Sequence, residues 1–479
     1  MNSTESKKVR INGYICICVL FIINLLNYMD RYTIAAVLTQ VQKTYEINDA
    51  EGGLLQTVFI CFFLIFAPLS GYIGDRYNRK WTMGLGITIW SLAVLLSSFV
   101  PKNLFWVFVL LRGIIGIGEA SYIVIAPTII ADTFVSVIRS RMLMLFYFAI
   151  PIGSGIGYMV GSWISSLFND WRWVLRITPA FGLICLLLII CFVKDPKRGE
   201  AEKEVGATNA LNTKTGSFYE DTIGICKIPT FIFSTLGYTS VVFVVGTLSW
   251  WGPTFVEHAV AANEGLSDTN LLATSKKDSI SLTFGAITLV AGIAGVLIGG
   301  TVAELWHTGK WCCRPFKTAR SNAFVCAIGC LFAVPFLILG MRLARPLLPV
   351  AWVLMFFAIT SLCLNWSINA DMLLDVVTPR RRGTATAWQT SFSHLFGDAS
   401  GPYIIGLVGD ISDWLRGSET SPLSRYNALI NGFYLLTALL VFGCIFFFIA
   451  GYYYVPDHKK FIDEMGKLFT CSKKVYMVI

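Results

Sequence analysis

The sequence predicts an all-α polytopic membrane protein with twelve transmembrane helices, divided between two six-helix halves. Of its 479 residues, 55% are hydrophobic and only 14% are charged, and the mean hydropathy is +0.65. A soluble domain carries about 25% charged residues. A helix needs about 20 apolar residues to cross the hydrocarbon core of a bilayer, and twelve such stretches use most of the chain.

The predicted helices follow the chain in two groups of six. Those of the first group lie at residues 14–38, 53–73, 81–100, 104–126, 142–167 and 173–193. Those of the second group lie at residues 231–251, 280–303, 323–341, 348–370, 385–408 and 431–454. The stretch between the groups is charged and poorly apolar, which is typical of a flexible linker. We therefore predict a first bundle at 1–193, a linker at 194–228, a second bundle at 229–455 and a tail at 456–479.

The positive charges are unevenly distributed between the predicted loops. Of the 38 Lys and Arg residues, 26 lie in segments that share a membrane side with the N-terminus, and 9 lie in loops on the other side. Cytosolic loops carry the excess of Lys and Arg, so we expect both termini in the cytosol. This bias accounts for the net charge of +9, and we expect no nucleic acid as a partner. Residues 1–10 are polar and the next apolar run has full spanning length, so we expect no cleavable signal peptide.

The sequence offers no recognisable catalytic or metal-binding motif. Most of the 13 cysteines lie in apolar stretches, where Cys acts as a small hydrophobic residue. Neither Cys16 with Cys18 nor Cys312 with Cys313 has a second pair at zinc-binding spacing. The glycines at 113–118 lie inside a predicted membrane helix, where small residues permit close helix packing. We expect no metal site, no disulfide framework and no enzyme.

A weak internal repeat supports two related halves. Asp132 precedes Arg139 by seven residues at the start of the fifth predicted helix, and Asp375 precedes Arg382 by seven at the start of the eleventh. A glycine-rich helix follows in both places. Membrane carriers built from two such repeats place their substrate site at the interface between them.

A charged signature closes the second predicted helix. Residues 71–80 read G-Y-I-G-D-R-Y-N-R-K and resemble the loop signature G-x-x-x-D-R-x-G-R-R of the major facilitator superfamily. Asn78 replaces a glycine, and Asn also adopts left-handed turns. Asp75 can pair with basic residues or with a helix N-terminus, which would hold one conformation closed, whereas Arg76 and Arg79 can alternatively anchor the protein at the membrane face. The predicted conformational lock consists of Asp75, Arg76, Arg79, Asp132 and Arg139.

Three ionisable residues lie far from the predicted helix ends: Asp30 in the first helix, and Arg112 and Glu119 in the fourth. A charge at the bilayer centre costs about 2.5–3.5 kcal/mol, and such residues normally mark an ion or substrate path. Arg112 and Glu119 are seven residues apart and share a helix face. We predict one buried group in which protonation of one acid moves Arg112 to the other, and so proton coupling through Asp30, Glu119 and Arg112. A static ion-pair network is the alternative.

The second half offers polar and aromatic candidates for substrate binding. His394 and Asp398 are four residues apart in the eleventh predicted helix. Because His titrates near neutrality, His394 can sense lumenal acid or bind a phosphate; a packing role is the alternative. The candidate substrate-binding residues are Arg112, Tyr122, Asn365, Trp366, Asn369, His394 and Asp398.

The last four residues, 476–479, read Y-M-V-I. A tyrosine, two residues and a bulky apolar residue resemble the signals that route membrane proteins to endosomes and lysosomes. Tyr476 and Ile479 would then contact a sorting adaptor.

Seven runs together resemble the spinster family of the major facilitator superfamily. They lie at residues 27–33, 52–60, 71–80, 112–122, 127–132, 146–158 and 393–398. The resemblance implies a carrier of lysophospholipids that leave lysosomes, or of sphingosine 1-phosphate that leaves cells. It also implies proton dependence at the positions of Asp30, Arg112 and Glu119.

We therefore predict a proton-coupled, alternating-access exporter of lysophospholipid or sphingolipid from the lysosome or late endosome to the cytosol. The expected partners are the lipid, the membrane and the adaptor; we expect a monomer that needs no cofactor beyond the proton gradient. A plasma-membrane sphingolipid exporter remains an alternative. So does an organic anion or sugar carrier, because residues 27–31 also resemble organic anion carriers and Arg112 suits a carboxylate. A receptor or scaffold without flux would not need to retain Asp30, Arg112 and Glu119.

Overall fold

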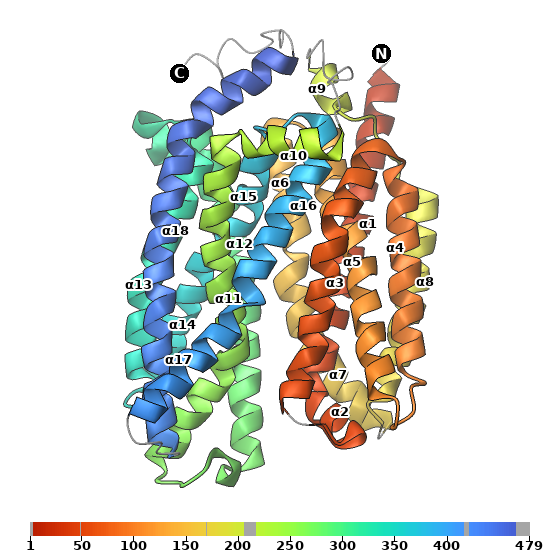
Figure 1. Cartoon of the computed structure of the whole chain (residues 1–479). Coiled ribbons are helices and arrows are strands. Elements are labelled where there is room, and N and C mark those ends of the chain that lie inside the picture. Colours follow the sequence, from red (N-terminus) through yellow and green to blue (C-terminus); the bar gives the residue numbers. More distant parts are fainter. Residues whose placement is uncertain (1–2, 48, 169, 206–216, 416–420, 466–479) are drawn as a thin grey trace. The chain divides into compact units, whose positions relative to one another are not determined.

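Figure 1 shows the computed structural model of the chain, which describes residues 3–47, 49–168, 170–205, 217–415 and 421–465. Within these residues all regular secondary structure is helical, because a helix satisfies its own backbone hydrogen bonds in lipid. Eleven helical segments of the described part of the chain are long and apolar enough to span a membrane. The predicted eleventh helix is broken into shorter pieces and therefore is not among them. The twelve-helix fold class is confirmed.

Helices form in each of the six stretches predicted in the first half. They are α1 (Ser3–Ala36), α2 (Leu38–Tyr45), α3 (Asp49–Arg76), α4 (Arg79–Ser97), α5 (Phe105–Thr133), α6 (Ser136–Tyr147), α7 (Ala149–Phe168) and α8 (Arg172–Phe192). The predicted fifth helix is divided between α6 and α7 at Phe148. Pro151 lies just beyond this break. Its backbone nitrogen carries no hydrogen, so it cannot donate a hydrogen bond to the carbonyl four residues earlier.

The second half begins with α11 (Pro229–Asn263) and ends with the long α18 (Pro422–Met465). Between them lie α12 (Thr274–Thr308), α13 (Ser321–Leu343), α14 (Leu348–Cys363), α15 (Asn365–Leu374), α16 (Arg382–Ser393), η5 (His394–Asp398) and α17 (Gly401–Leu415). The widened turn η5 separates α16 from α17. Gly397 there has φ −108° and ψ −106°, and atoms of Val242 lie 2.8 Å from where a Cβ would stand, so a side chain would not fit.

The predicted linker contains two short helices, α9 (Glu200–Glu204) and α10 (Phe218–Cys226). A capping box starts α10: Ser217 Oγ accepts a hydrogen bond from Glu220 N, and Glu220 Oε2 accepts one from Ser217 N at 2.7 Å. Such reciprocal capping satisfies two backbone donors at a helix start. The described parts of the linker therefore have defined local structure.

The chain forms two compact units, which we describe separately. Unit 1 contains Met1–Phe231, Ala370–Ser391 and Tyr454–Ile479, and unit 2 contains Ile232–Asn369 and Phe392–Tyr453. Unit 1 thus includes short pieces from the second half of the sequence, because packing rather than chain order defines it. The bundle boundaries at 193, 228 and 455 stay a prediction.

Two glycines bring backbones together around the predicted charge group in unit 1. A Cβ on Gly118 of α5 would lie 2.5 Å from Gly86 O and 2.7 Å from Trp90 Cβ, both on α4. A Cβ on Gly157 of α7 would lie 2.5 Å from Met29 O on α1. These close approaches hold α4 against α5 just before Glu119, and α7 against α1 just before Asp30.

Candidate functional site

The three predicted intramembrane charges are all buried in unit 1. Asp30 on α1 is 1% exposed, and Arg112 and Glu119 on α5 are each 2% exposed. Arg112 interacts electrostatically with both acids. The three residues therefore lie close together, as the sequence predicted, and their role in proton coupling stays a prediction.

The polar atoms of this group are sparsely hydrogen-bonded. Trp90 Nε1 donates to Asp30 Oδ2 at 3.0 Å. Among the described residues, no hydrogen-bond partner meets Asp30 Oδ1, Arg112 Nε, Arg112 Nη1 or either carboxylate oxygen of Glu119. Buried polar atoms are normally satisfied, so these atoms are exceptions. The exchange of partners within the group stays a prediction.

Arg31 is a member of this group that the sequence analysis did not select. It interacts electrostatically with Glu119, and its guanidinium lies 5.1 Å from the centroid of the Phe59 ring. The guanidinium of Arg112 lies 5.6 Å from the same ring. Two arginines thus flank one buried aromatic ring, which attracts cations through its quadrupole. The sequence shows that Arg31 is next to Asp30. It does not show which way the Arg31 side chain points.

A second polar region of unit 1 joins the ends of α3 and α16. Asp75 Oδ1 accepts a hydrogen bond from Gly383 N at 2.8 Å, and Asp75 Oδ2 accepts from Thr384 N at 2.8 Å and Thr384 Oγ1 at 2.7 Å. The first turn of a helix has unsatisfied N–H groups and a partial positive charge. Asp75 therefore caps α16, which is one of the two pairings expected for it.

The acid and arginine of each sequence repeat pair crosswise. Asp132 lies 3.2 Å from Arg382, and Arg139 lies 3.1 Å from Asp375. Arg139 also contacts Asp371 at 2.7 Å. The equal seven-residue spacing thus corresponds to two reciprocal ion pairs, which hold the start of α16 and the end of α15 to α5 and α6. These contacts connect residues of the predicted conformational lock. The lock role of Asp75, Arg76, Arg79, Asp132 and Arg139 stays a prediction.

Acids of the linker region complete these contacts and were missed from the sequence. Asp195 contacts Arg79 at 2.7 Å, and Glu202 on α9 contacts Arg382 at 2.5 Å. Arg79 also reaches Asp132 at 2.6 Å and is 1% exposed, so it does not anchor the protein at a membrane surface. The linker is rich in charged residues, and its sequence does not distinguish the acids that form these ion pairs from acids that are exposed to solvent.

Arg76 is paired through the second linker helix. Asp221 on α10 contacts Arg76 at 2.7 Å and Arg381 at 2.8 Å, and the Asp221 side chain is fully buried. The Arg76 guanidinium also lies 3.6 Å from the Tyr72 ring centroid. Through these two contacts, α10 bridges the end of α3 and the turn that precedes α16.

Asp375 lies between α15 and α16, outside the spanning segments. Burial acts to raise the pKa of Asp375, but His458, Arg139 and the hydroxyl of Tyr454 outweigh it and hold this pKa below its ordinary range. The opposite charges and donors favour the carboxylate. Asp375 is therefore ionised at physiological pH, as its pair with Arg139 requires.

The remaining substrate-binding candidates differ in their surroundings. Tyr122 is 2% exposed in unit 1, and its hydroxyl donates to Leu20 O, which joins α5 to α1. In unit 2, His394 Nδ1 lies 2.8 Å from Asp398 Oδ1 within η5. Asn365 is fully buried, and its Nδ2 donates to Leu362 O at 3.0 Å.

The other two candidates, Trp366 and Asn369, follow Asn365 on α15. Trp366 is partly buried and Asn369 is 2% exposed. Asn365 Oδ1 has no partner among the described residues. The substrate-binding role of this whole set stays a prediction. Tyr476 and Ile479, the predicted sorting residues, lie outside the described residues.

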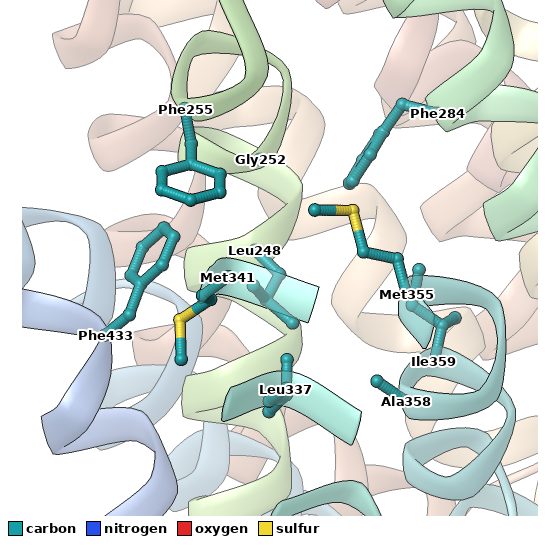
Figure 2. A pocket seen from close by; sticks show the side chains of 10 residues that line it. All are labelled: Leu248, Gly252, Phe255, Phe284, Leu337, Met341, Met355, Ala358, Ile359 and Phe433. Atoms are coloured by element: carbon teal, nitrogen blue, oxygen red, sulfur yellow. The ribbon is translucent and has the colours of Figure 1, made fainter. Parts of the chain in front are cut away.

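An apolar cavity lies inside unit 2 (Figure 2). All ten residues that line it are apolar. Figure 2 shows Phe255 and Phe433 on one side, and Phe284 and Met355 on the other. The lining therefore presents only apolar surface.

Comparison with known proteins defines the class. Residues 20–402 match the family model described as Major Facilitator Superfamily. The fold resembles a proton:xylose symporter, XylE, with a TM-score of 0.64 and 16% identity over 92% of this chain and 96% of that one. The helical fold and the buried intramembrane charges therefore belong to a multi-pass major facilitator transporter, not to an enzyme.

Closer relatives define the family within that class. The chain is 43% identical to "Protein spinster homolog 1" of Xenopus tropicalis, over 93% of this chain and 81% of the relative. It is 42% identical to "Sphingosine-1-phosphate transporter SPNS2" of the same species, over 94% and 83%. A bacterial homolog of the human lysosomal transporter Spinster, solved in an inward-facing occupied conformation, gives a TM-score of 0.57 at 20% identity over 94% of this chain and 97% of that one. This chain belongs to the spinster family.

Proposed function

We propose that this transporter couples proton movement to the export of a lysophospholipid or a related sphingolipid from the lysosome to the cytosol. The observation that carries the coupling is the buried group of Asp30, Arg112 and Glu119. Its acids share an arginine without being hydrogen-bonded to it through Arg112 Nε or Nη1. Uptake of one proton would therefore redirect Arg112 from one acid to the other.

The proposed substrate class is supported by Arg112 and by one of the relatives. An arginine guanidinium binds phosphate through two parallel hydrogen bonds, and Arg112 has two buried N–H groups without partners among the described residues. The relative that is named a sphingosine-1-phosphate transporter supports a sphingolipid, which combines an anionic phosphate with a hydrocarbon chain.

The direction and the compartment are further parts of the proposal. The excess of Lys and Arg on the side of the termini supports a cytosolic position for both. An acidic lumen would then supply protons from the opposite side, and they would move with the lipid toward the cytosol. The lysosomal description of the Spinster protein to which the bacterial structure is related supports this compartment.

Reconstituted vesicles test the substrate class. When the solution outside the vesicles is more acidic than the interior, we expect the wild type to move lysophosphatidylcholine or sphingosine 1-phosphate. We expect it to move neither a hexose nor a small carboxylate. Arg112→Lys should lower lipid flux about tenfold or more, because Lys keeps the charge but loses the planar fork. Flux of the hexose or the carboxylate instead would favour the small-solute carrier. Wild-type lipid affinity in the Lys variant would assign Arg112 a structural role.

The tail provides a test of location. Tyr476→Ala should move the protein from lysosomes to the cell surface, because the proposed adaptor requires the tyrosine side chain. Quantitative imaging against a lysosomal marker would measure the change, with Tyr453→Ala, on α18, as a tyrosine control outside the tail. An unchanged lysosomal pool would remove the tail as the signal.

The alternative location has a specific observation in its favour. The similarity to SPNS2 is nearly equal to the similarity to spinster homolog 1. A wild-type protein found only at the plasma membrane would therefore favour export of a signalling sphingolipid from the cell.

A further inference from the structure

Phe59 on α3 is an uncharged member of the buried charge group. It is 1% exposed, and the guanidinium carbons of Arg31 and Arg112 lie 5.1 and 5.6 Å from the centroid of its ring. A cation within about 6 Å of a ring centroid is attracted by the ring quadrupole, and the attraction is stronger where water is excluded. One buried ring therefore attracts two arginines that come from different helices, α1 and α5.

The ring offsets a repulsion between these two arginines. Arg31 and Arg112 carry like charges and act on each other electrostatically, and such repulsion is stronger in a buried site than in water. Asp30 and Glu119 attract Arg112 from the other direction of charge, but each acid also brings a negative charge into the site. Phe59 adds attraction for both arginines and adds no charge.

The attraction of the ring does not use the hydrogen-bond donors of Arg112. A guanidinium has five N–H donors, and a carboxylate paired with it through two parallel hydrogen bonds would occupy two of them. The attraction to a ring acts on the charge as a whole and forms no hydrogen bond. Arg112 Nε and Nη1 have no hydrogen-bond partner among the described residues. Phe59 thus attracts Arg112 while these two donors stay available to an anionic group.

Two glycines of α5 fix the position of Phe59 relative to Arg112. Gly116 is four residues beyond Arg112 and therefore shares its helix face. A Cβ on Gly116 would overlap Phe59 O, and a Cβ on Gly113 would lie 2.9 Å from the ring of Phe62. The backbone of α3 thus packs directly on α5 at Phe59 itself, one helical turn from Arg112.

We propose that Phe59 is a positioning residue that holds Arg112, together with Arg31, for the anionic head group of the transported lipid. This inference rests on the lipid substrate proposed above and adds the residue that keeps Arg112 ready to bind a phosphate. Without the ring, Arg112 would turn its donors to Asp30 or Glu119, and a phosphate would have to displace a carboxylate in order to bind.

Fluorinated phenylalanines in place of Phe59 test this role in the purified full-length protein. Each added fluorine withdraws electron density from the face of the ring and weakens its attraction for a cation, while the shape of the side chain changes little. We expect the Kd of sphingosine 1-phosphate to rise stepwise with the number of fluorines, by about tenfold for the trifluorinated ring. Phe59→Leu, which removes the ring, should have at least the same effect. Sphingosine has the same hydrocarbon chain without the phosphate, so its Kd should stay unchanged throughout the series.

The same fluorinated series at Phe108 is a matched control. Phe108 is fully buried, and its ring packs on those of Tyr45 and Trp171 at centroid distances of 5.2 and 5.9 Å. We expect no change in the Kd of either lipid there, because this ring contacts other rings.

Three results would overturn the role of Phe59. They are an unchanged Kd of sphingosine 1-phosphate along the Phe59 series, an equal rise for sphingosine, and an equal rise along the Phe108 series. A wild type that binds sphingosine 1-phosphate no better than sphingosine would overturn it as well, because no head group is then recognised. The expected stepwise rise in a protein that shows no proton-driven flux would support the role of Phe59 and count instead against the proposed function.

Discussion

Asp30→Asn and Glu119→Gln should each abolish the pH dependence of transport while the protein remains folded. Each substitution keeps the size of the side chain and removes its ability to exchange a proton. Both acids are buried beside Arg112, and a neutral amide cannot compete for the guanidinium as a carboxylate does. Arg112 would then stay with the remaining acid at every pH, and the coupled cycle would stop.

Initial rates of lipid flux into vesicles, measured from pH 5 to 7.5, would detect this loss. Asp463→Asn is a suitable control, because this substitution makes the same chemical change at a residue that is exposed near the end of α18. Thermal unfolding of each purified variant would establish that it is folded. Normal pH-dependent flux in both core variants would show that the buried charge group is not the coupling site.

Gly71→Ala should reduce flux strongly by preventing contact between α3 and α16. A Cβ on Gly71 would overlap Gly383 O and lie 2.7 Å from the Cβ of Ala387. Backbone atoms cannot rotate away as a side chain can, so the two helices must separate. Overpacking of this kind costs about 1–3 kcal/mol, which would lower the population of the contacted state by about 5–150-fold. An alternating-access cycle needs that state in every turnover.

Labelling of an introduced cysteine would report the separation directly. Ala67 is fully buried in a cluster with Ala387, Ala120, Phe63 and Val124, so Ala67→Cys should react slowly with a maleimide while α3 and α16 are in contact. Addition of Gly71→Ala should accelerate this reaction. Gly285→Ala is the matched control, since nothing lies within 4 Å of a Cβ at that position. Equal labelling rates and equal flux for both glycine variants would exclude the steric role.

The sequence alone determined the spans and the buried charges, for a common physical reason. The bilayer demands long apolar stretches, so interruptions are conspicuous, and an ionisable residue such as Asp30, Arg112 or Glu119 is costly enough there to imply a use. The spacing of Asp132 to Arg139, repeated at Asp375 to Arg382, also indicated related segments. The repeat could not specify that the acid of each segment pairs with the arginine of the other segment, which the structure shows.

Only the tertiary structure decided which polar groups meet. Trp90 and Tyr122 are both aromatic residues of apolar helices, yet Trp90 donates to a carboxylate and Tyr122 to a backbone carbonyl of another helix. In the same way, Asp221 was one acid among many in a charged linker until α10 placed it between two arginines. The pattern of hydrophobic residues indicates which segments lie in lipid. Hydrogen bonds between helices depend instead on how each helix is rotated and shifted along its neighbour. Contacts such as that of Gly118 with Trp90, between residues on different helices, fix this rotation and shift.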